Sequence, residues 1–298
     1  MVGREQRYSG DGETRSAWLF NLPLVLLAAV FVLVPVAGTL LTSLYREVSY
    51  LPVRFVGLEN YLLLLSEPSF WQSLRFTLLF VLVSVALEFV LGLGFALTLN
   101  EALPGRGLLR VIVLVPWTIP IAVSARLWEL VYNFDFGLFN AVIQRLGILD
   151  GPVNWLGDPA GAFTAIVISD VWKTTPFMAL ILLAGLSTIP EDLYRQAMID
   201  GTHFVQRFRH VTLPMLKPAI VVALLFRTID AIRIFDLVYV LTGGGPGGAT
   251  TSLSLHAFHY YVSGDFGYGS AVSMVVFLLA GILSVFYIRV GRFQEVLR

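Results

Sequence analysis

Four charged side chains alternate in sign within a stretch that is otherwise apolar. Arg227, Asp230, Arg233 and Asp236 recur at a spacing of three residues. A helix turns back by about 60° at each such step, so neighbours can pair but the four cannot share one face. One charge at the centre of a bilayer costs about 2.5–3.5 kcal/mol, so four unpaired charges would cost on the order of 10 kcal/mol. Three interpretations stay open: the charges pair and fix the rotation of the helix, Arg227 and Asp230 line a solute pathway, or the series relays protons.

A second group of polar and aromatic residues surrounds Pro176. Trp172, Lys173, Thr174 and Phe177 lie near the middle of another apolar stretch. Proline removes a backbone hydrogen bond and bends a helix, and irregular backbone at membrane depth is tolerated only where protein or water satisfies it. Aromatic rings stack on the apolar faces of sugars while polar groups bind the hydroxyls. The segment is therefore a candidate sugar site, and a kink that serves helix packing is the alternative.

Two further apolar stretches carry polar features of the same kind. Residues 116–120 read Pro-Trp-Thr-Ile-Pro, and Glu88 is the lone charge of its stretch. We expect Glu88 to pair with an arginine from elsewhere in the chain, because an unpaired charge inside a membrane is costly. Asp170 and Lys173, three residues apart, can neutralise each other.

Several kinds of chemistry find no support in the sequence. The chain has no cysteine, and no grouping of His, Asp or Glu has the spacing of a metal site. We expect His256 and His259 to lie at a membrane interface rather than to bind a metal. The glycine cluster at residues 243–248 lacks the Gly-Lys-Ser/Thr ending of a phosphate-binding loop. We therefore expect no catalytic residues, no metal and no cofactor in this chain, and no nucleotide hydrolysis by it.

The composition is that of an integral membrane protein. Of the 298 residues, 57% are hydrophobic and 13% are charged, whereas soluble domains carry about 25% charged residues. The 20 basic and 20 acidic side chains balance, so no net positive charge favours binding to nucleic acid.

Six stretches are long and apolar enough to cross a bilayer, which takes about 20 residues. The sequence thus predicts an all-α, polytopic membrane protein with six transmembrane helices. The predicted organisation is a tail at 1–17, a first transmembrane helix at 18–45, an external segment with an interfacial helix at 46–75, a five-helix core at 76–288 that includes a cytoplasmic loop at 187–217, and a tail at 289–298. The six stretches are residues 17–45, 76–99, 108–132, 163–186, 218–241 and 266–288.

The distribution of Lys and Arg predicts the orientation. With the N-terminus in the cytoplasm, the inner segments hold 12 of these residues and the outer segments hold 4, in agreement with the positive-inside rule. Both termini and the loop between the fourth and fifth stretches are therefore expected in the cytoplasm.

That loop, residues 189–218, is the longest strongly charged segment between two spans. Glu191 and Asp192 fall in what should be a first helical turn, where negative charge suits the helix dipole. Gly201 permits a bend before a second short amphipathic segment, and Leu213 and Pro214 lead into the next apolar stretch. A helix–Gly–helix element of this kind suits a docking surface, and a solvated loop with some helix is the alternative.

The spacing within this loop resembles a known signature. Ala197, Gly201, Val211, Leu213 and Pro214 stand at the intervals found in the cytoplasmic loop of permease subunits of binding-protein-dependent ABC importers. The segments FVGLENY and LTGGGP resemble the carbohydrate branch of that family, in particular the first permease of maltose and trehalose importers. The similarity covers about residues 15–290.

The resemblance implies a type I importer permease fold and assigns roles to both groups of residues. The loop would be a coupling helix that docks in an ATPase subunit. Two positions depart from the signature, since Arg195 and Gln196 stand where relatives have Glu and Ala. The implied coupling residues are Glu191, Asp192, Arg195, Gln196, Ala197, Asp200, Gly201, Leu213 and Pro214. The substrate pathway would take Trp117, Ile121, Thr174, Phe177, Arg227, Ala231 and Ile234 from the resemblance, with Trp172, Lys173 and Asp230 added from their own chemistry.

The resemblance also implies partners and a location. A second homologous permease, two copies of an ATPase subunit that binds ATP and Mg, and an external solute-binding protein would complete an importer in the plasma membrane of a bacterium or archaeon, surrounded by lipid. The expected solute is a disaccharide such as trehalose or maltose. A polyol, a glycerol phosphate or an oligosaccharide is the alternative within this class, and a proton-coupled secondary transporter is the alternative outside it.

Overall fold

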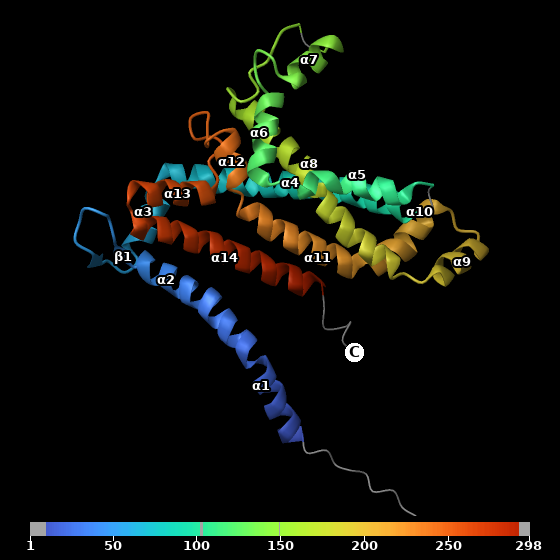
Figure 1. Cartoon of the computed structure of the whole chain (residues 1–298), viewed down its shortest axis with the longest axis horizontal. Helices are drawn as coiled ribbons and strands as arrows, with labels where there is room; N and C mark the ends of the chain where they lie inside the picture. Colours follow the sequence, from blue (N-terminus) through green and yellow to red (C-terminus); the bar gives the residue numbers. More distant parts are fainter. Residues whose placement is uncertain (1–9, 102–103, 149, 292–298) are drawn as a thin grey trace, which may run out of the picture.

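The computed structural model describes residues 10–101, 104–148 and 150–291, and these are almost entirely helical. Of the two predicted tails, residues 1–9 and 292–298 lie outside the described residues. Four long helices pack together as a bundle (Figure 1). They are α4 (Pro68–Asn100), α8 (Pro159–Ser187), α11 (Leu213–Ile232) and α14 (Phe266–Gly291).

Small residues bring the helices of this bundle close together. A Cβ atom added at Gly185 of α8 would lie 2.4 Å from the Cβ of Ala219 on α11. A Cβ atom added at Gly92 of α4 would lie 2.8 Å from Cγ of Met178 on α8. Because lipid is as apolar as the side chains, such close backbone packing contributes much of the attraction between membrane helices.

The N-terminal helices leave the bundle. α1 (Gly10–Ala28), the π-helical turn η1 (Ala29–Leu33) and α2 (Val34–Ser43) follow one another, and only α2 packs on the bundle, against α14 (Figure 1). The apolar stretch Trp18–Ser43 contributes almost nothing to the protein interior. Its surface is therefore available to lipid or to another chain.

The two ends of the bundle carry different structures (Figure 1). At the first, which we call the hairpin end, β1 (Tyr45–Arg46) pairs antiparallel with β2 (Arg54–Phe55), followed by α3 (Glu59–Ser66), the helix predicted in the external segment. α12 (Asp236–Leu241) and α13 (Leu253–Ser263) lie at the same end. At the other, the loop end, are α9 (Glu191–Ile199), α10 (Phe204–Arg207) and the π-helical turn η2 (Phe208–Thr212).

Two of the predicted crossings are broken in the structure. Residues 108–132 form α5 (Arg106–Thr118) and α6 (Ile121–Val131), which meet at an angle of 92°. Pro120 explains this break, because proline cannot continue a helix and forces the preceding residue into an extended conformation, as seen at Ile119 with φ −71° and ψ 131°. Residues 218–241 likewise divide into α11 and α12, with non-helical backbone between them at Phe235.

The number of crossings can be compared with the prediction. Among the described residues, four helices are long and apolar enough to cross a membrane, and the bent pair of α5 and α6 makes a fifth. α11 is the remaining predicted crossing, and Lys217, Arg227 and Asp230 give it three charged side chains. Such a helix needs partners for these charges within the protein.

An additional helix lies in the connection between the third and fourth predicted crossings. α7 (Leu138–Arg145) contains Asn140, whose side chain accepts hydrogen bonds from the backbone N–H of Val153 at 3.2 Å and from Nε1 of Trp155 at 2.8 Å. The same amide donates to the carbonyl of Val153 at 3.0 Å. One buried asparagine thus organises both sides of this connection.

Candidate functional site

Arg227, on α11, is the centre of a buried ion-pair network. Its side chain is only 2% exposed. The guanidinium makes two hydrogen bonds to the carboxylate of Glu88 on α4: Nε donates to Oε2, and Nη2 donates to Oε1 at 2.9 Å. This fork is the strong bidentate arrangement for a carboxylate. The prediction that Glu88 pairs with a distant arginine is confirmed.

Two more carboxylates complete the network. Nη2 of Arg227 donates to Oδ2 of Asp170 on α8, and Nη1 donates to Oδ2 of Asp230 at 3.1 Å. Arg227 therefore ties α4, α8 and α11 together, which agrees with the interpretation that charge pairing fixes the rotation of α11. Asp230 differs from the other members because 62% of its side chain is exposed.

Lys173 makes a different contact from the one that we predicted. Its neighbour Asp170 binds Arg227, and the Lys173 ammonium instead donates to the carbonyl oxygens of Trp117, at 3.3 Å, and Ile119. These carbonyls lie at the C-terminal end of α5, where the last turn of a helix has no backbone partners and carries partial negative charge. Lys173 thus donates hydrogen bonds to backbone carbonyl groups that have no helical partner because the helix breaks before Pro120.

A cavity of about 270 Å³ lies where the two broken crossings meet α8. This volume is close to the lower bound of small-molecule pockets, about 300–1,000 Å³. Non-helical backbone at membrane depth is tolerated where it lines such a cavity. The lining residues are Ile121 from α6, Asp170, Lys173 and Thr174 from α8, and Arg227, Asp230, Ala231, Arg233, Ile234, Phe235, Asp236 and Leu237 from α11, α12 and the segment between them.

Most of the residues predicted for a substrate pathway gather here. Seven of the ten line the cavity: Ile121, Lys173, Thr174, Arg227, Asp230, Ala231 and Ile234. Trp117 and Phe177 lie outside the lining and stack on each other, with ring centroids 5.8 Å apart. Phe177 is one helical turn along α8 from Lys173, so the aromatic pair continues the same face of this helix.

Trp172 lies apart from the cavity. Its ring packs edge-on against Trp128, with centroids 5.6 Å apart. It lines an apolar groove of about 560 Å³ between α4, α5 and α8. This places Trp172 on a different face of α8 from Lys173 and Thr174.

The structure adds members that the sequence analysis did not assign to the pathway. Asp170, Arg233 and Asp236 line the same cavity. The alternating charges drew attention to Arg233 and Asp236, but the spacing of three residues along a continuous helix would place them on different faces from Arg227. Because α11 ends at Ile232, Arg233 lies in the break and Asp236 begins α12, so neither residue continues a face of α11. No group of His, Cys, Asp or Glu in the described ranges has the geometry of a metal site.

The loop end contains the helix–Gly–helix element that we predicted. Gly201 has a φ of +75°, a left-handed conformation that favours glycine. The backbone N–H of Thr202 donates to the carbonyl of Ala197 and that of Gly201 to the carbonyl of Met198, both at 3.1 Å. These two bonds form the Schellman motif that ends a helix. Gly201 thus sets the direction in which the chain leaves α9.

The side chains of the predicted coupling residues have defined positions in α9 and α11. Arg195, at a departure from the family signature, pairs with Glu191 at 2.9 Å and with Asp192 at 3.5 Å on the surface of α9. Leu213 and Pro214 are the first residues of α11, which continues directly from the π-helical turn η2. Gln196, Ala197 and Asp200 lie in the second half of α9 and at its C-terminal cap.

Apolar side chains are exposed around this turn. Ile199, at the end of α9, is 85% exposed, and Phe204, at the start of α10, is 64% exposed. On the opposite side of α9, the hydroxyl of Tyr194 lies 3.1 Å from that of Thr212 in η2. α9 therefore contacts η2 on one side and presents apolar groups on the other.

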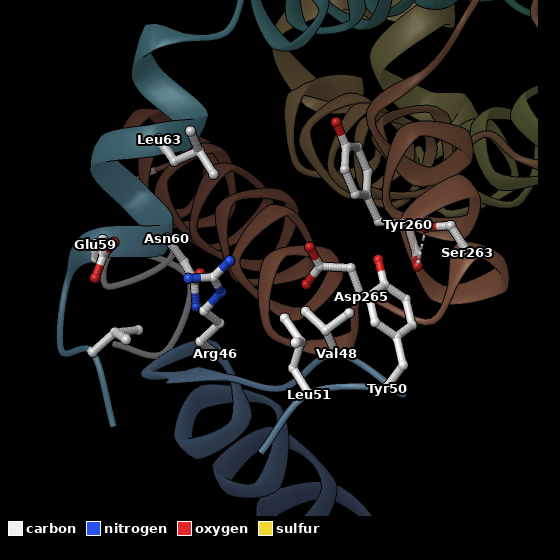
Figure 2. A pocket seen from close by; sticks show the side chains of 11 residues that line it. Arg46, Val48, Tyr50, Leu51, Glu59, Asn60, Leu63, Tyr260, Ser263 and Asp265 are labelled. Atoms are coloured by element: carbon white, nitrogen blue, oxygen red, sulfur yellow. Dashed lines mark hydrogen bonds between the residues drawn. The ribbon is translucent and has the colours of Figure 1, made fainter. Parts of the chain in front are cut away.

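The hairpin end has a separate polar cavity of about 380 Å³. Figure 2 shows Arg46 and Tyr50 from the hairpin, Glu59 from α3 and Asp265 around it. Beside this cavity, Glu67 accepts hydrogen bonds from the hydroxyls of Tyr260, at 2.7 Å, and Tyr268. Burial alone would raise the pKa of Glu67, but these hydrogen bonds outweigh it and hold the pKa below its ordinary value.

The two histidines of this end differ in exposure. His256 is buried against the rings of Tyr260 and Tyr268, with centroids 5.2 and 6.1 Å away, whereas His259 is exposed. His256 is buried because α13 packs against α4 and α14.

Comparisons with known proteins give a consistent result. Residues 88–292 match the family described as "Binding-protein-dependent transport system inner membrane component". The trehalose/maltose transport system permease protein MalF of Thermococcus litoralis is 56% identical over 284 residues, which cover 95% of this chain and 96% of that protein. The sulfoquinovosyl glycerol transport system permease protein SmoG of Agrobacterium fabrum is 39% identical over 298 residues, which cover 99% and 96%.

A solved structure has the same architecture. A chain in the crystal structure of a bacterial alginate ABC transporter, in complex with its alginate pentasaccharide-bound periplasmic protein, superposes with a TM-score of 0.81. It is 22% identical, and the match covers 97% of this chain and 98% of that one. The likeness shows a shared fold and confirms the architecture expected from the sequence.

Proposed function

The chain belongs to the family of binding-protein-dependent transport system inner membrane components, and from this premise we propose that it is the permease subunit of an ATP-driven importer of a disaccharide such as trehalose or maltose. It would form half of the translocation pore. The observation that carries this proposal is the cavity at the junction of the two broken crossings, together with 56% identity to a trehalose/maltose permease over nearly the whole chain.

The lining of this cavity suits a sugar. Asp230 and Thr174 present polar oxygen atoms, and the neighbouring Trp117–Phe177 pair presents an aromatic surface. Sugar hydroxyls donate hydrogen bonds to carboxylates, and the C–H faces of a sugar pack against aromatic rings. On α8 itself, Thr174 and Phe177 place a polar and an aromatic contact within one helical turn.

We assign the loop end to docking of a separate ATPase subunit. The exposed apolar residues Ile199 and Phe204 flank a turn whose direction Gly201 fixes. An apolar patch of this kind on a solvent-facing loop is typical of a protein interface. Two ATPase copies would hold ATP and Mg, a second homologous permease would complete the pore, and an external solute-binding protein would deliver the sugar to the hairpin end.

The same assignment fixes an orientation in the membrane. The loop end and both termini would face the cytoplasm, and the membrane would be the plasma membrane of a bacterium or archaeon. ATP and the sugar would act by binding inward-facing and outward-facing states with different affinities.

The alternative is a proton-coupled transporter that uses the charges of residues 227–236 as its relay. The contacts of Arg227 favour the importer instead. A relay needs groups that take up and release protons in sequence, whereas Arg227 stays charged and holds three carboxylates in place.

The decisive experiment is transport by the reconstituted complex. The permease, its companion permease, the ATPase and the binding protein are placed in liposomes, and uptake of labelled trehalose and maltose is measured with and without ATP. We expect uptake that requires ATP and persists with an uncoupler. Uptake that continues without ATP and collapses with the uncoupler would establish the proton-coupled alternative.

A further inference from the structure

We propose that the cavity selects an uncharged sugar and excludes anionic sugars of the same size, and that Asp230 is the residue that sets this preference. The inference rests on the proposed function and concerns the same cavity. One relative of this chain is named for trehalose and maltose, which are uncharged, and another for sulfoquinovosyl glycerol, which carries a sulfonate. The charge of the solute therefore differs between relatives.

The first step is the hydrogen-bond count of Arg227, the most prominent cation of the cavity. A guanidinium has five N–H donors. Four of them are used by carboxylates: two by Glu88, one by Asp170 and one by Asp230. Arg227 is therefore a positioning residue for its neighbours, with little left to offer an anionic group of a solute.

The second step concerns the other cations of the lining. Lys173 is held by the carbonyls of Trp117 and Ile119, so its charge is committed to the end of α5. Arg233 is exposed, and Asp236, three residues further on, brings the opposite charge to the same cavity.

The third step is the charge balance. The lining contains three cations, Lys173, Arg227 and Arg233, and three carboxylates, Asp170, Asp230 and Asp236. Glu88 adds a fourth carboxylate directly behind Arg227. An anionic solute would lose hydration on entry and meet no net positive charge in return.

An uncharged sugar meets a better-matched surface. Only Oδ2 of Asp230 binds Arg227, and the side chain is largely exposed to the cavity. Its free oxygen can accept hydrogen bonds from sugar hydroxyls, whereas a phosphate or carboxylate group at the same place would be repelled. Asp230 thus acts twice, because it occupies one N–H of Arg227 and turns a negative charge towards the solute.

The test compares two matched solutes and two matched variants. Trehalose and trehalose 6-phosphate differ by one anionic group. Their binding to the purified permease–ATPase complex is measured by isothermal titration calorimetry without the binding protein, so that the selectivity of the binding protein does not enter. Asp230→Asn removes one charge and replaces the carboxylate acceptor of Arg227 with an uncharged, weaker amide acceptor, while Asp236→Asn removes one charge from the same cavity at a residue that makes no hydrogen bond to Arg227.

For the unaltered complex we expect trehalose 6-phosphate to bind at least about tenfold more weakly than trehalose, as expected for like charges brought together. Asp230→Asn should reduce this ratio several-fold, and Asp236→Asn should reduce it less. Equal binding of the two solutes by the unaltered complex would overturn the inference, as would an equal effect of the two variants.

The two proposals fail in different ways. A complex that imports neither trehalose nor maltose with ATP contradicts the proposed function. A complex that imports one of them with ATP, yet binds trehalose 6-phosphate as tightly as trehalose, contradicts the charge preference alone. Size-exclusion profiles of both variants show whether each complex remains assembled.

Discussion

The ammonium of Lys173 donates a hydrogen bond to the carbonyl oxygen of Ile119, which directly follows α5 at the 92° bend between α5 and α6. A side chain of α8 therefore supports the bend of a different crossing. The contact brings the break to the cavity and explains why a lysine is tolerated in the middle of an apolar helix.

Replacing this lysine should destabilise the bend. Lys173→Met keeps a side chain of similar length but leaves the carbonyls of Trp117 and Ile119 without their donor. We expect a loss of about 1–3 kcal/mol, the cost of an unsatisfied buried polar group, measured as a lower thermal midpoint in detergent. Lys217→Met is the control, because Lys217 is the second lysine of the sequence and is exposed. Equal midpoints for the two variants would contradict the supporting role of Lys173.

Replacing Arg227 alone should destabilise the protein, and replacing Arg227 and Glu88 together should destabilise it by less than the sum of the two single changes. Arg227→Gln leaves Glu88 and Asp170 buried without their cation, and breaking a buried pair in this way costs about 3–5 kcal/mol. In a double-mutant cycle, Arg227→Gln combined with Glu88→Gln should lose less stability than the sum of the two single changes. Strictly additive losses in thermal unfolding would show that the two residues do not interact.

Gly201 should be required for the shape of the loop. Gly201→Ala forces a side chain into left-handed backbone, which costs about 1–2 kcal/mol, and should change the exit direction of α9. We expect weaker stimulation of ATPase activity by the sugar-loaded binding protein. Gly94→Ala is the matched control, since Gly94 lies in α4 and an added Cβ meets no atom within 4 Å. Full stimulation with Gly201→Ala would argue against the loop as the coupling element.

Glu67 should make stability depend on pH at the hairpin end. Its pKa in the folded protein lies below the ordinary value of 4.5, so its contribution is present above pH 4.5 and is lost as the pH falls through the lower, folded value. Glu67→Gln should therefore lower the thermal midpoint at neutral pH, and the difference from the unaltered protein should shrink in acid. A difference that grows in acid would contradict this account.

Local signals in the sequence account for much of the fold. The apolar runs predicted α4, α8 and α14, and Glu191, Asp192 and Gly201 predicted the start and end of α9. The break at Ile119 also had a local cause in Pro120, but a run of apolar residues around it read as one crossing. α11 ends at Ile232 with neither Pro nor Gly beside it, so that break depends on packing and could not be predicted from neighbouring residues.

The site was harder to predict than the helices. Glu88 and Arg227 are 139 residues apart, and the lone charge indicated only that a partner exists. Asp170 and Lys173 had a plausible local pairing, yet each found a partner on another helix. The spacing of residues along one helix shows which charged side chains could pair on that helix. Which pairs actually form depends on how several helices pack together.

The close approach of Gly185 to Ala219 has a mechanical consequence. At this point α8 and α11 approach so closely that no side chain fits at Gly185, and a larger residue there would force the two helices apart. Gly185 lies two residues from the end of α8 at Ser187, about 3 Å, and twelve residues from Lys173, about 18 Å. A larger residue at Gly185 would therefore act as a wedge between α8 and α11, at a point between the loop end and the cavity.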